Sequence, residues 1–130
     1  MTYKQFIGME KYTWQHKLAF LKLERQLLGH NTFRGYIHDW DKVLYLYPLA
    51  FIVGRDKQWV HSYHRTHNRH HVESPYTKTR RDYIEMVIDW ECARFTKPDK
   101  PLNAYQVMQQ IYPWTEPHIT PILREFGLIR

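Results

Sequence analysis

The sequence has one cysteine, no long apolar run and no apolar N-terminus of signal-peptide type. Cys92 alone excludes an internal disulfide framework and is typical of a reducing compartment. Charged residues and a histidine interrupt the N-terminal region, unlike a secretory signal. The longest apolar run, from Val43 to Val53, contains Pro48 and is too short to cross a bilayer, so we expect a buried helix and a connection there. These absences predict a cytoplasmic protein with no membrane partner.

Long blocks of basic charge are missing as well. The formal net charge of +6 favours anionic partners, but the basic residues are spread along the chain. We therefore expect a small anionic substrate such as a nucleotide. Nucleic acid stays open as a partner, although no known nucleic-acid-binding motif is present. The sequence also leaves formation of a homo-oligomer open.

Apolar residues at helical spacing run through most of the chain. From Tyr3 to Leu28 they predict one or two helices, whose inner face includes Trp14 and Leu18. A second strong pattern runs from Lys78 to Phe95. Hydrophobic residues make up 43% of the sequence, which argues against disorder, and no segment alternates convincingly with the period of a strand. We therefore predict an all-α, compact single-domain helical bundle.

Histidines are concentrated in one short segment. Five of the nine lie between His61 and His71, ahead of Pro75, and we expect a helix from Lys57 to end near this proline. At about 100° per residue, four side chains of that helix share one face: His64, His67, Asn68 and His71. His70 points away from it. Imidazoles at this spacing are a common way to present metal ligands, and the alternative is a polar or pH-sensitive surface helix.

Other candidate metal ligands lie in separate parts of the chain. His16 belongs to the first predicted helix, and the adjacent pair His38-Asp39 is followed by Lys42. Asp89 lies in an otherwise apolar segment, one helical turn after Glu85. Imidazole and carboxylate ligands together suit Mn, Fe, Co, Ni or Zn rather than Mg or Ca alone. We therefore expect a divalent transition metal, as one or two ions.

The order H…HD…H…H…D, from His16 to Asp89, resembles the HD-domain superfamily of helical metal-dependent phosphohydrolases. The segment His38-Asp39-Trp40-Asp41-Lys42 fits the H-D-x-x-K form often seen there. The histidine segment, with the later Glu85-Met-x-x-Asp89-Trp90, also resembles a small uncharacterised family common in phages and bacteria. That second resemblance suggests a phage-encoded protein in the host cytoplasm and supplies no activity. The predicted organisation is one HD-like domain, residues 1–130, with a metal-site core at about 10–95 and C-terminal helices at about 102–127.

The HD resemblance implies a role for each candidate residue. One ion would be held by His16, His38, Asp39 and Asp89. Asp39 would bridge to a second ion held by His64 and His71, with His67 or His70 as rival ligands. Substrate phosphate would be neutralised or bound by Lys42, Arg80, Arg81 and Asn68, and Glu85 would orient a ligand or the attacking water. An ion pair between Lys42 and Asp41 is the alternative role for that lysine.

The resemblance implies a phosphohydrolase that acts on a nucleotide or another small phosphoester. Two other functions stay open. Some relatives of the HD fold use the same ligands with two irons to oxidise C–H bonds, which implies a di-iron oxygenase. A metal-stabilised helical module that binds a nucleotide or a protein without turnover is the non-enzymatic alternative. One feature departs from the HD pattern: the candidate ligands of the second ion all lie within one short segment.

Overall fold

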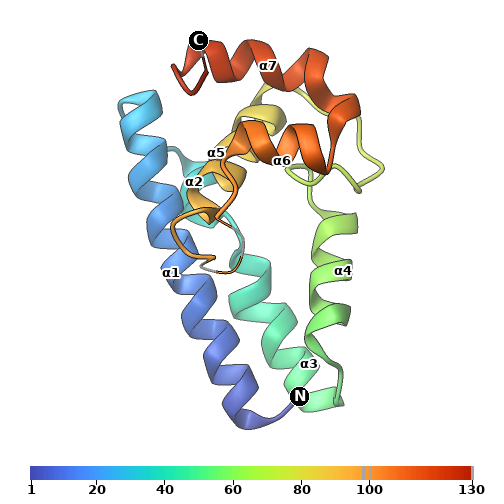
Figure 1. Ribbon diagram of the computed structural model, residues 1–130. Coiled ribbons are helices and arrows are strands. Elements are labelled where there is room, and N and C mark those ends of the chain that lie inside the picture. Colours follow the sequence, from blue (N-terminus) through green and yellow to red (C-terminus); the bar gives the residue numbers. More distant parts are fainter. Residues whose placement is uncertain (98, 100, 130) are drawn as a thin grey trace.

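The longest helix, α1 (Tyr3–Leu28), runs along one side of the molecule in Figure 1. The computed structural model describes residues 1–97, 99 and 101–129. The side chain of Thr2 accepts a hydrogen bond from Gln5 N at the start of α1. Gly29, at φ +82°, ends the helix in the left-handed conformation that glycine adopts without strain. The predicted helix is therefore confirmed, as a single one.

The inner face of α1 differs from the predicted one. Trp14 and Leu18 are 46% and 64% exposed, whereas His16, Lys17 and Glu24 are buried. The prediction assigned apolar residues to the inside and polar residues to solvent. It was right for Phe20 and Leu23, which are buried, and wrong for Trp14 and Leu18, because polar side chains of this helix find partners in a buried polar centre.

The chain then forms α2 (Phe33–Ile37), the π-helix η1 (Lys42–Leu46) and α3 (Tyr47–Val53). The helix predicted in the apolar run is confirmed, but its predicted burial was wrong, since Leu44 and Ile52 are 64% and 78% exposed. The buried residues of η1 and α3 lie on the face away from Leu44 and Ile52. That face packs against α1 and against the helix that follows α3.

The histidine segment begins as the helix α4 (Lys57–His67). Asn68 has an extended backbone, and its side-chain Nδ2 donates to the main-chain oxygen of His64 at 2.8 Å. Such local bonds compete with helical ones, so the helix stops eight residues before Pro75. The prediction of one long histidine helix was therefore wrong. His70, which such a helix would turn away, is instead buried.

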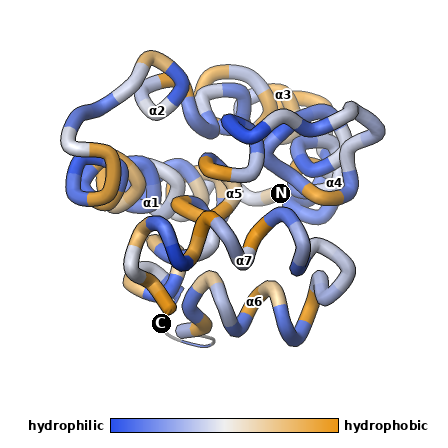
Figure 2. Tube along the Cα trace, turned by 90° about the horizontal axis from the view of Figure 1, so that it is seen from above, coloured by the Kyte–Doolittle hydropathy of each residue, from blue (hydrophilic) through white to orange (hydrophobic). Residues whose placement is uncertain are grey.

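Helix α5 (Arg80–Ala93) lies in the middle of the molecule, with α1 on one side and the C-terminal helices on another (Figure 2). These are α6 (Ala104–Gln110), the 3-10 turn η2 (Pro113–Thr115) and α7 (Glu116–Glu125). The predicted helix after Lys78 and the shorter C-terminal helices are confirmed. The polar centre described below lies where α5 approaches α1 and α4.

Three apolar clusters surround that centre. The largest joins α5, α6 and α7 through Met86, Met108 and Ile119. The other two lie between α1 and α5, and between α3 and α4. Among the described residues the secondary structure is helical throughout, without a strand, so the predicted all-α single-domain fold is confirmed. Three residues of the predicted domain, Pro98, Lys100 and Arg130, lie outside the described residues.

Within the described parts of the chain, no helix combines the length and apolar character needed to span a bilayer.

Candidate metal centre

Four predicted ligands from three parts of the chain converge on one point. His16 comes from α1, His38-Asp39 from the turn after α2, and Asp89 from α5. Each offers one ligand atom, and these atoms all lie within 4.8 Å of one another. The side chains are 13% exposed or less. We call these four residues the aspartate-rich group, and within it His16 Nε2 lies 2.6 Å from Asp89 Oδ1.

A second group lies directly beside the first. His64 from α4 and His70 and His71 from the following turn offer one atom each within 4.8 Å of one another. Asp39 stands between the groups. Its Oδ2 lies 3.5 Å from His38 Nε2, and its Oδ1 lies 2.9 Å from His64 Nε2 and 3.5 Å from His70 Nε2. We call the three histidines with Asp39 Oδ1 the trihistidine group.

The turn that carries Asp39 is held in an unusual conformation. Asp39 has φ +61°, and no other non-glycine residue of the described chain has a positive φ. Aspartate tolerates this region better than most residues, but the conformation persists only where the surroundings impose it. The buried ammonium of Lys17 donates to the main-chain oxygens of Tyr36, at 2.9 Å, and His38. A polar residue on the inner face of α1 thus fixes the turn that aims Asp39 at both groups.

Glycine is required at Gly35, just before this turn. A Cβ atom there would lie 2.2 Å from Glu24 Oε1. The same carboxylate accepts hydrogen bonds from the main chain and side chain of Thr32 at 3.0 and 2.7 Å. Glu24 therefore pins α2 against α1, and the close approach positions His38 beside His16.

Carboxylates hold the outer nitrogens of three histidines. Glu85 Oε2 lies 3.1 Å from His38 Nδ1 and 2.7 Å from His70 Nδ1. Asp41 Oδ2 lies 2.6 Å from His64 Nδ1 and also accepts from Asn68 Nδ2 at 3.0 Å. With Nδ1–H donating to a carboxylate, Nε2 of each ring faces the centre and becomes the ligand atom once it carries no proton. Metal-binding histidines are typically oriented in this way.

Buried polar atoms without a partner show whether the two groups fit an ion. Four of the seven buried side-chain atoms without a hydrogen-bond partner among the described residues lie in the trihistidine group: Asp39 Oδ1, His64 Nε2, His70 Nε2 and His71 Nε2. Buried polar atoms are rarely left without a partner, because each costs about 1–3 kcal/mol. A divalent cation would satisfy all four at once. The residues therefore fit a transition-metal ion, which prefers imidazole and carboxylate ligands.

The charges of the centre are strongly coupled. Burial alone would lower the pKa of His38, but Asp39 and Asp89 outweigh it and raise this pKa to about 10. Burial would raise the pKa values of those two carboxyls, yet the neighbouring histidines hold both well below the ordinary range. His71 is different, since burial and the nearby His70 lower its pKa to about 2 and keep the ring neutral. A neutral imidazole is the form that binds a metal.

A cavity of about 290 Å³ opens onto the centre. Its lining includes His16, Asp39, His71 and Asp89. Three cationic side chains line it: Lys42, Arg65 and Lys97. Lys42 Nζ lies 3.8 Å from Asp39 Oδ2. Burial lowers the pKa of this ammonium, but the surrounding carboxylates raise it further, so the net pKa lies above its ordinary value and the group stays charged. The cavity can therefore attract an anion to the metal ligands.

Several predicted site residues lie away from the centre. His67 is exposed, and its ring stacks on Tyr63 with centroids 3.9 Å apart. Arg80 is exposed and pairs with Glu125 of α7, and Arg81 is exposed near the start of α5. Asn68 touches Asp41 and the main chain of His64 rather than the cationic cavity.

Sequence reasoning missed other functional candidates. Asp41 orients His64, and Lys17 fixes the Asp39 turn. Arg34 pairs with Glu85 at 3.0 Å and holds it against the histidines. Arg65 and Lys97 line the cavity in place of Arg80 and Arg81. Only Asp41 had a signal in the sequence, because it lies within the H-D-x-x-K segment.

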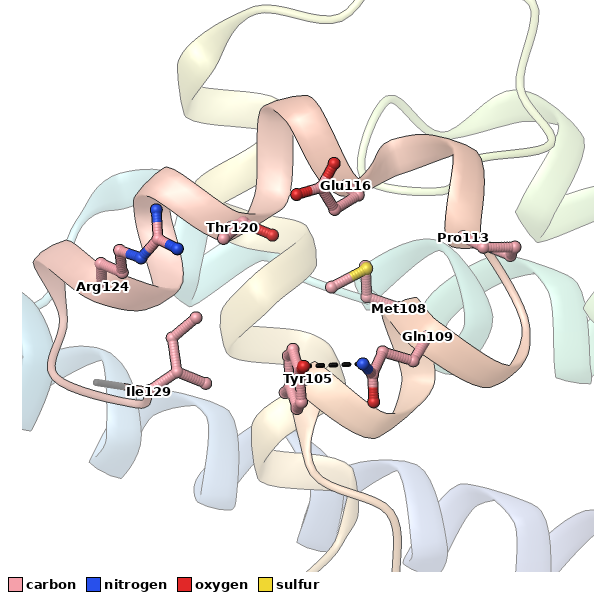
Figure 3. A pocket seen from close by; sticks show the side chains of 8 residues that line it. All are labelled: Tyr105, Met108, Gln109, Pro113, Glu116, Thr120, Arg124 and Ile129. Carbon is pink, nitrogen blue, oxygen red and sulfur yellow. Dashed lines mark hydrogen bonds between the residues drawn. The ribbon is translucent and has the colours of Figure 1, made fainter.

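A second cavity, of about 590 Å³, lies between α6 and α7 (Figure 3). Tyr105 and Gln109 of α6 meet there in a 2.6 Å hydrogen bond, and Glu116 and Arg124 of α7 face the same space. Its lining brings no histidines or paired carboxylates together. The candidate metal ligands therefore lie at the metal centre and not in this second cavity.

Comparison with protein-family models, curated proteins and solved structures finds no match to this chain. The geometry of its own residues therefore carries the functional argument.

Proposed function

We propose that this protein is a metal-dependent phosphohydrolase that acts on a nucleotide or another small phosphoester. The observation that carries the proposal is the position of Asp39, whose two oxygens face two separate sets of imidazoles. A carboxylate in this position can bridge two divalent ions. Pairs of such ions are typical of enzymes that displace groups at phosphorus, where they activate water and neutralise charge on the phosphoryl oxygens.

The cavity supports an anionic substrate. Lys42, Arg65 and Lys97 line it together with His16, Asp39 and Asp89. An entering phosphate would therefore be attracted by cationic side chains in the same cavity as the candidate metal ligands. Lys42, fixed beside Asp39, is positioned to neutralise charge that develops on the phosphoryl group. Glu85 contributes indirectly, because it holds His38 and His70 in the tautomer that leaves Nε2 free.

The aromatic wall of the cavity favours a substrate with a planar or apolar part. The rings of Trp90 and Tyr112 stack 5.4 Å apart with an angle of 9° between them, and both line the cavity. A base or aromatic leaving group would find a flat apolar surface there. The aromatic wall therefore favours a nucleotide over inorganic polyphosphate as the substrate.

The proposal is tested by metal loading followed by a substrate panel. The purified protein would be loaded separately with Mn, Fe, Co, Ni or Zn, and phosphate release would be measured from nucleotides and aryl phosphoesters. We expect release that depends on the metal and that disappears in Asp39→Asn. His67→Ala is the matched control and should retain activity, since His67 lies outside both groups.

Three results would contradict the proposal. If none of the five metals binds, the centre is a charge network and not a metal site. Oxygen uptake with iron and without phosphate release would favour the di-iron oxygenase. Metal and nucleotide binding without turnover of any substrate would favour a binding module.

A further inference from the structure

The two ligand groups of the centre are chemically unequal. The aspartate-rich group combines two imidazoles with two carboxylates. The trihistidine group combines three imidazoles with one oxygen of Asp39. A site richer in imidazole and poorer in carboxylate is softer and favours Zn²⁺ over Mn²⁺.

Each group can offer four protein ligands, so the number of ligands alone does not distinguish them; in the trihistidine group the fourth would be Asp39 Oδ1, which lies within 3.5 Å of two of the three histidines. Structural Zn²⁺ sites are closed by four protein ligands, whereas catalytic sites keep a position open for water or substrate. Ligands about 2.0–2.1 Å from a tetrahedral ion lie roughly 3.3 Å apart. The distances from Asp39 Oδ1 to His64 and His70 Nε2, 2.9 and 3.5 Å, fall on either side of that value.

The groups differ most in how well they are satisfied without an ion. In the aspartate-rich group, Asp89 Oδ1 lies within hydrogen-bond distance of His16 Nε2, at 2.6 Å, and of His38 Nε2, at 3.2 Å. In the trihistidine group, all four central atoms are buried and none makes a hydrogen bond of good geometry among the described residues, although Asp39 Oδ1 lies 2.9 Å from His64 Nε2. Loss of an ion would therefore cost the first group little and the second group much.

We propose that the trihistidine group is a closed structural Zn²⁺ site, an inference that rests on the metal-dependent function proposed above. It is filled first and kept, and the ion of the aspartate-rich group is the exchangeable one. His70 and His71 lie in the turns after α4, so the retained ion ties this segment to α4 and to Asp39. The exchangeable ion would lie near Lys42, whose Nζ is 3.8 Å from Asp39 Oδ2, in the cationic cavity proposed to receive the substrate.

The first test uses the wild-type protein and needs no variant. The protein loaded with excess Zn²⁺ would be dialysed against a chelator, and the metal content followed by elemental analysis. We expect two ions per chain to fall quickly to one, with the last released only as the protein unfolds. Loss of both ions at one rate would overturn the inference.

Variants then assign the retained ion. Loss of a residue that merely orients a ligand costs about 10–100-fold in metal affinity, so loss of a ligand should cost at least about 100-fold. His71→Ala should lose the retained ion, whereas His16→Ala and the control His67→Ala should keep it. His71→Gln, which preserves more of the packing, guards against a folding defect. Retention in both His71 variants with loss in His16→Ala would overturn the inference.

Cobalt gives an independent readout, because tetrahedral Co²⁺ absorbs visible light far more strongly than Co²⁺ with more ligands. The ion that resists the chelator should carry the intense tetrahedral spectrum, and a weak spectrum would contradict a closed four-ligand site.

The outcomes of these experiments also separate the two proposals. A retained ion that depends on His71, without phosphate release, refutes only the phosphohydrolase. Phosphate release with two ions that exchange together refutes only the structural zinc site.

Discussion

The two sides of helix α5 are stabilised in opposite ways. Toward α6 and α7 it presents Met86, Val87 and Trp90 to a closed apolar cluster. Toward α1 and α4 it presents Glu85 and Asp89 to buried histidines. The apolar side gains stability from burial alone, at about 25 cal/mol per Å². The polar side buries charged groups, which is favourable only when they are fully paired. Comparison of the two sides shows an apolar half stabilised by burial and a polar half that leaves buried atoms without a hydrogen-bond partner among the described residues.

The largest effect is expected where both metal groups depend on one residue. Asp39→Asn keeps the size of the side chain and a residue that tolerates positive φ, but removes the charge that both groups share. We expect both ions to bind much more weakly and phosphate release to fall by at least about 10³-fold, since a two-ion centre cannot assemble. Elemental analysis and a phosphate-release assay would check this. Full metal content in the variant would mean that Asp39 bridges nothing.

The apolar side should respond to truncation regardless of metal. Ile119→Ala removes a fully buried side chain from the cluster of α5, α6 and α7. Such truncations cost about 2–5 kcal/mol in the free energy of unfolding. Denaturant unfolding with and without Zn²⁺ should give the same loss, with unchanged metal affinity. A loss that changes with Zn²⁺ would show that the two sides are not independent.

Glu85→Gln tests the carboxylate shared by two imidazoles. The amide keeps the shape but weakens its bonds to His38 and His70 Nδ1. Partners of metal ligands contribute about 10–100-fold to affinity, so we expect a loss in that range from both groups. Competition with a chromophoric chelator would measure it. Asp82→Asn, which also breaks a contact to Arg34 but touches no histidine, is the control.

The smallest effect, about tenfold or less, is expected from a change of one pH unit. The pKa of His38 is raised to about 10 without metal, so at pH 7 the ring carries a proton that an incoming ion must displace. Metal affinity should therefore rise by up to about tenfold per pH unit between pH 7 and 10, and level off above. Calorimetry in buffers of different ionisation enthalpy would count the protons released. Affinity that does not change over this range would show that His38 is already neutral.

The fold was predictable where one physical signal dominates. Apolar spacing located α5 correctly, and it also placed the end of α1 at Leu28. The pattern failed on α1 itself, because His16, Lys17 and Glu24 are buried with polar partners from distant segments. It failed again at Asn68, whose side chain ends the helix that the histidine spacing suggested.

The candidate site was predictable in its ligand types more than in its geometry. The sequence pointed to His16, His38-Asp39 and Asp89, and the structure places them together. It could not place His70 inside the centre, since that depends on where α4 ends. Arg80 and Arg81, predicted to bind phosphate, are exposed and do not line the cavity, whereas Arg65 and Lys97 reach it through tertiary packing. Long-range packing leaves no local trace in a sequence.

The spacing of the ligands along the chain has a consequence for the order of folding. His16 and Asp89 are separated by 73 residues, whereas the histidines of the trihistidine group lie within one short segment. Contacts between distant residues require the closure of long loops and form slowly. We therefore expect the trihistidine segment to capture Zn²⁺ early, and stopped-flow refolding should be faster with Zn²⁺ present from the start than with Zn²⁺ added late. The ion would then act as a nucleus on which the distant helices α1 and α5 meet.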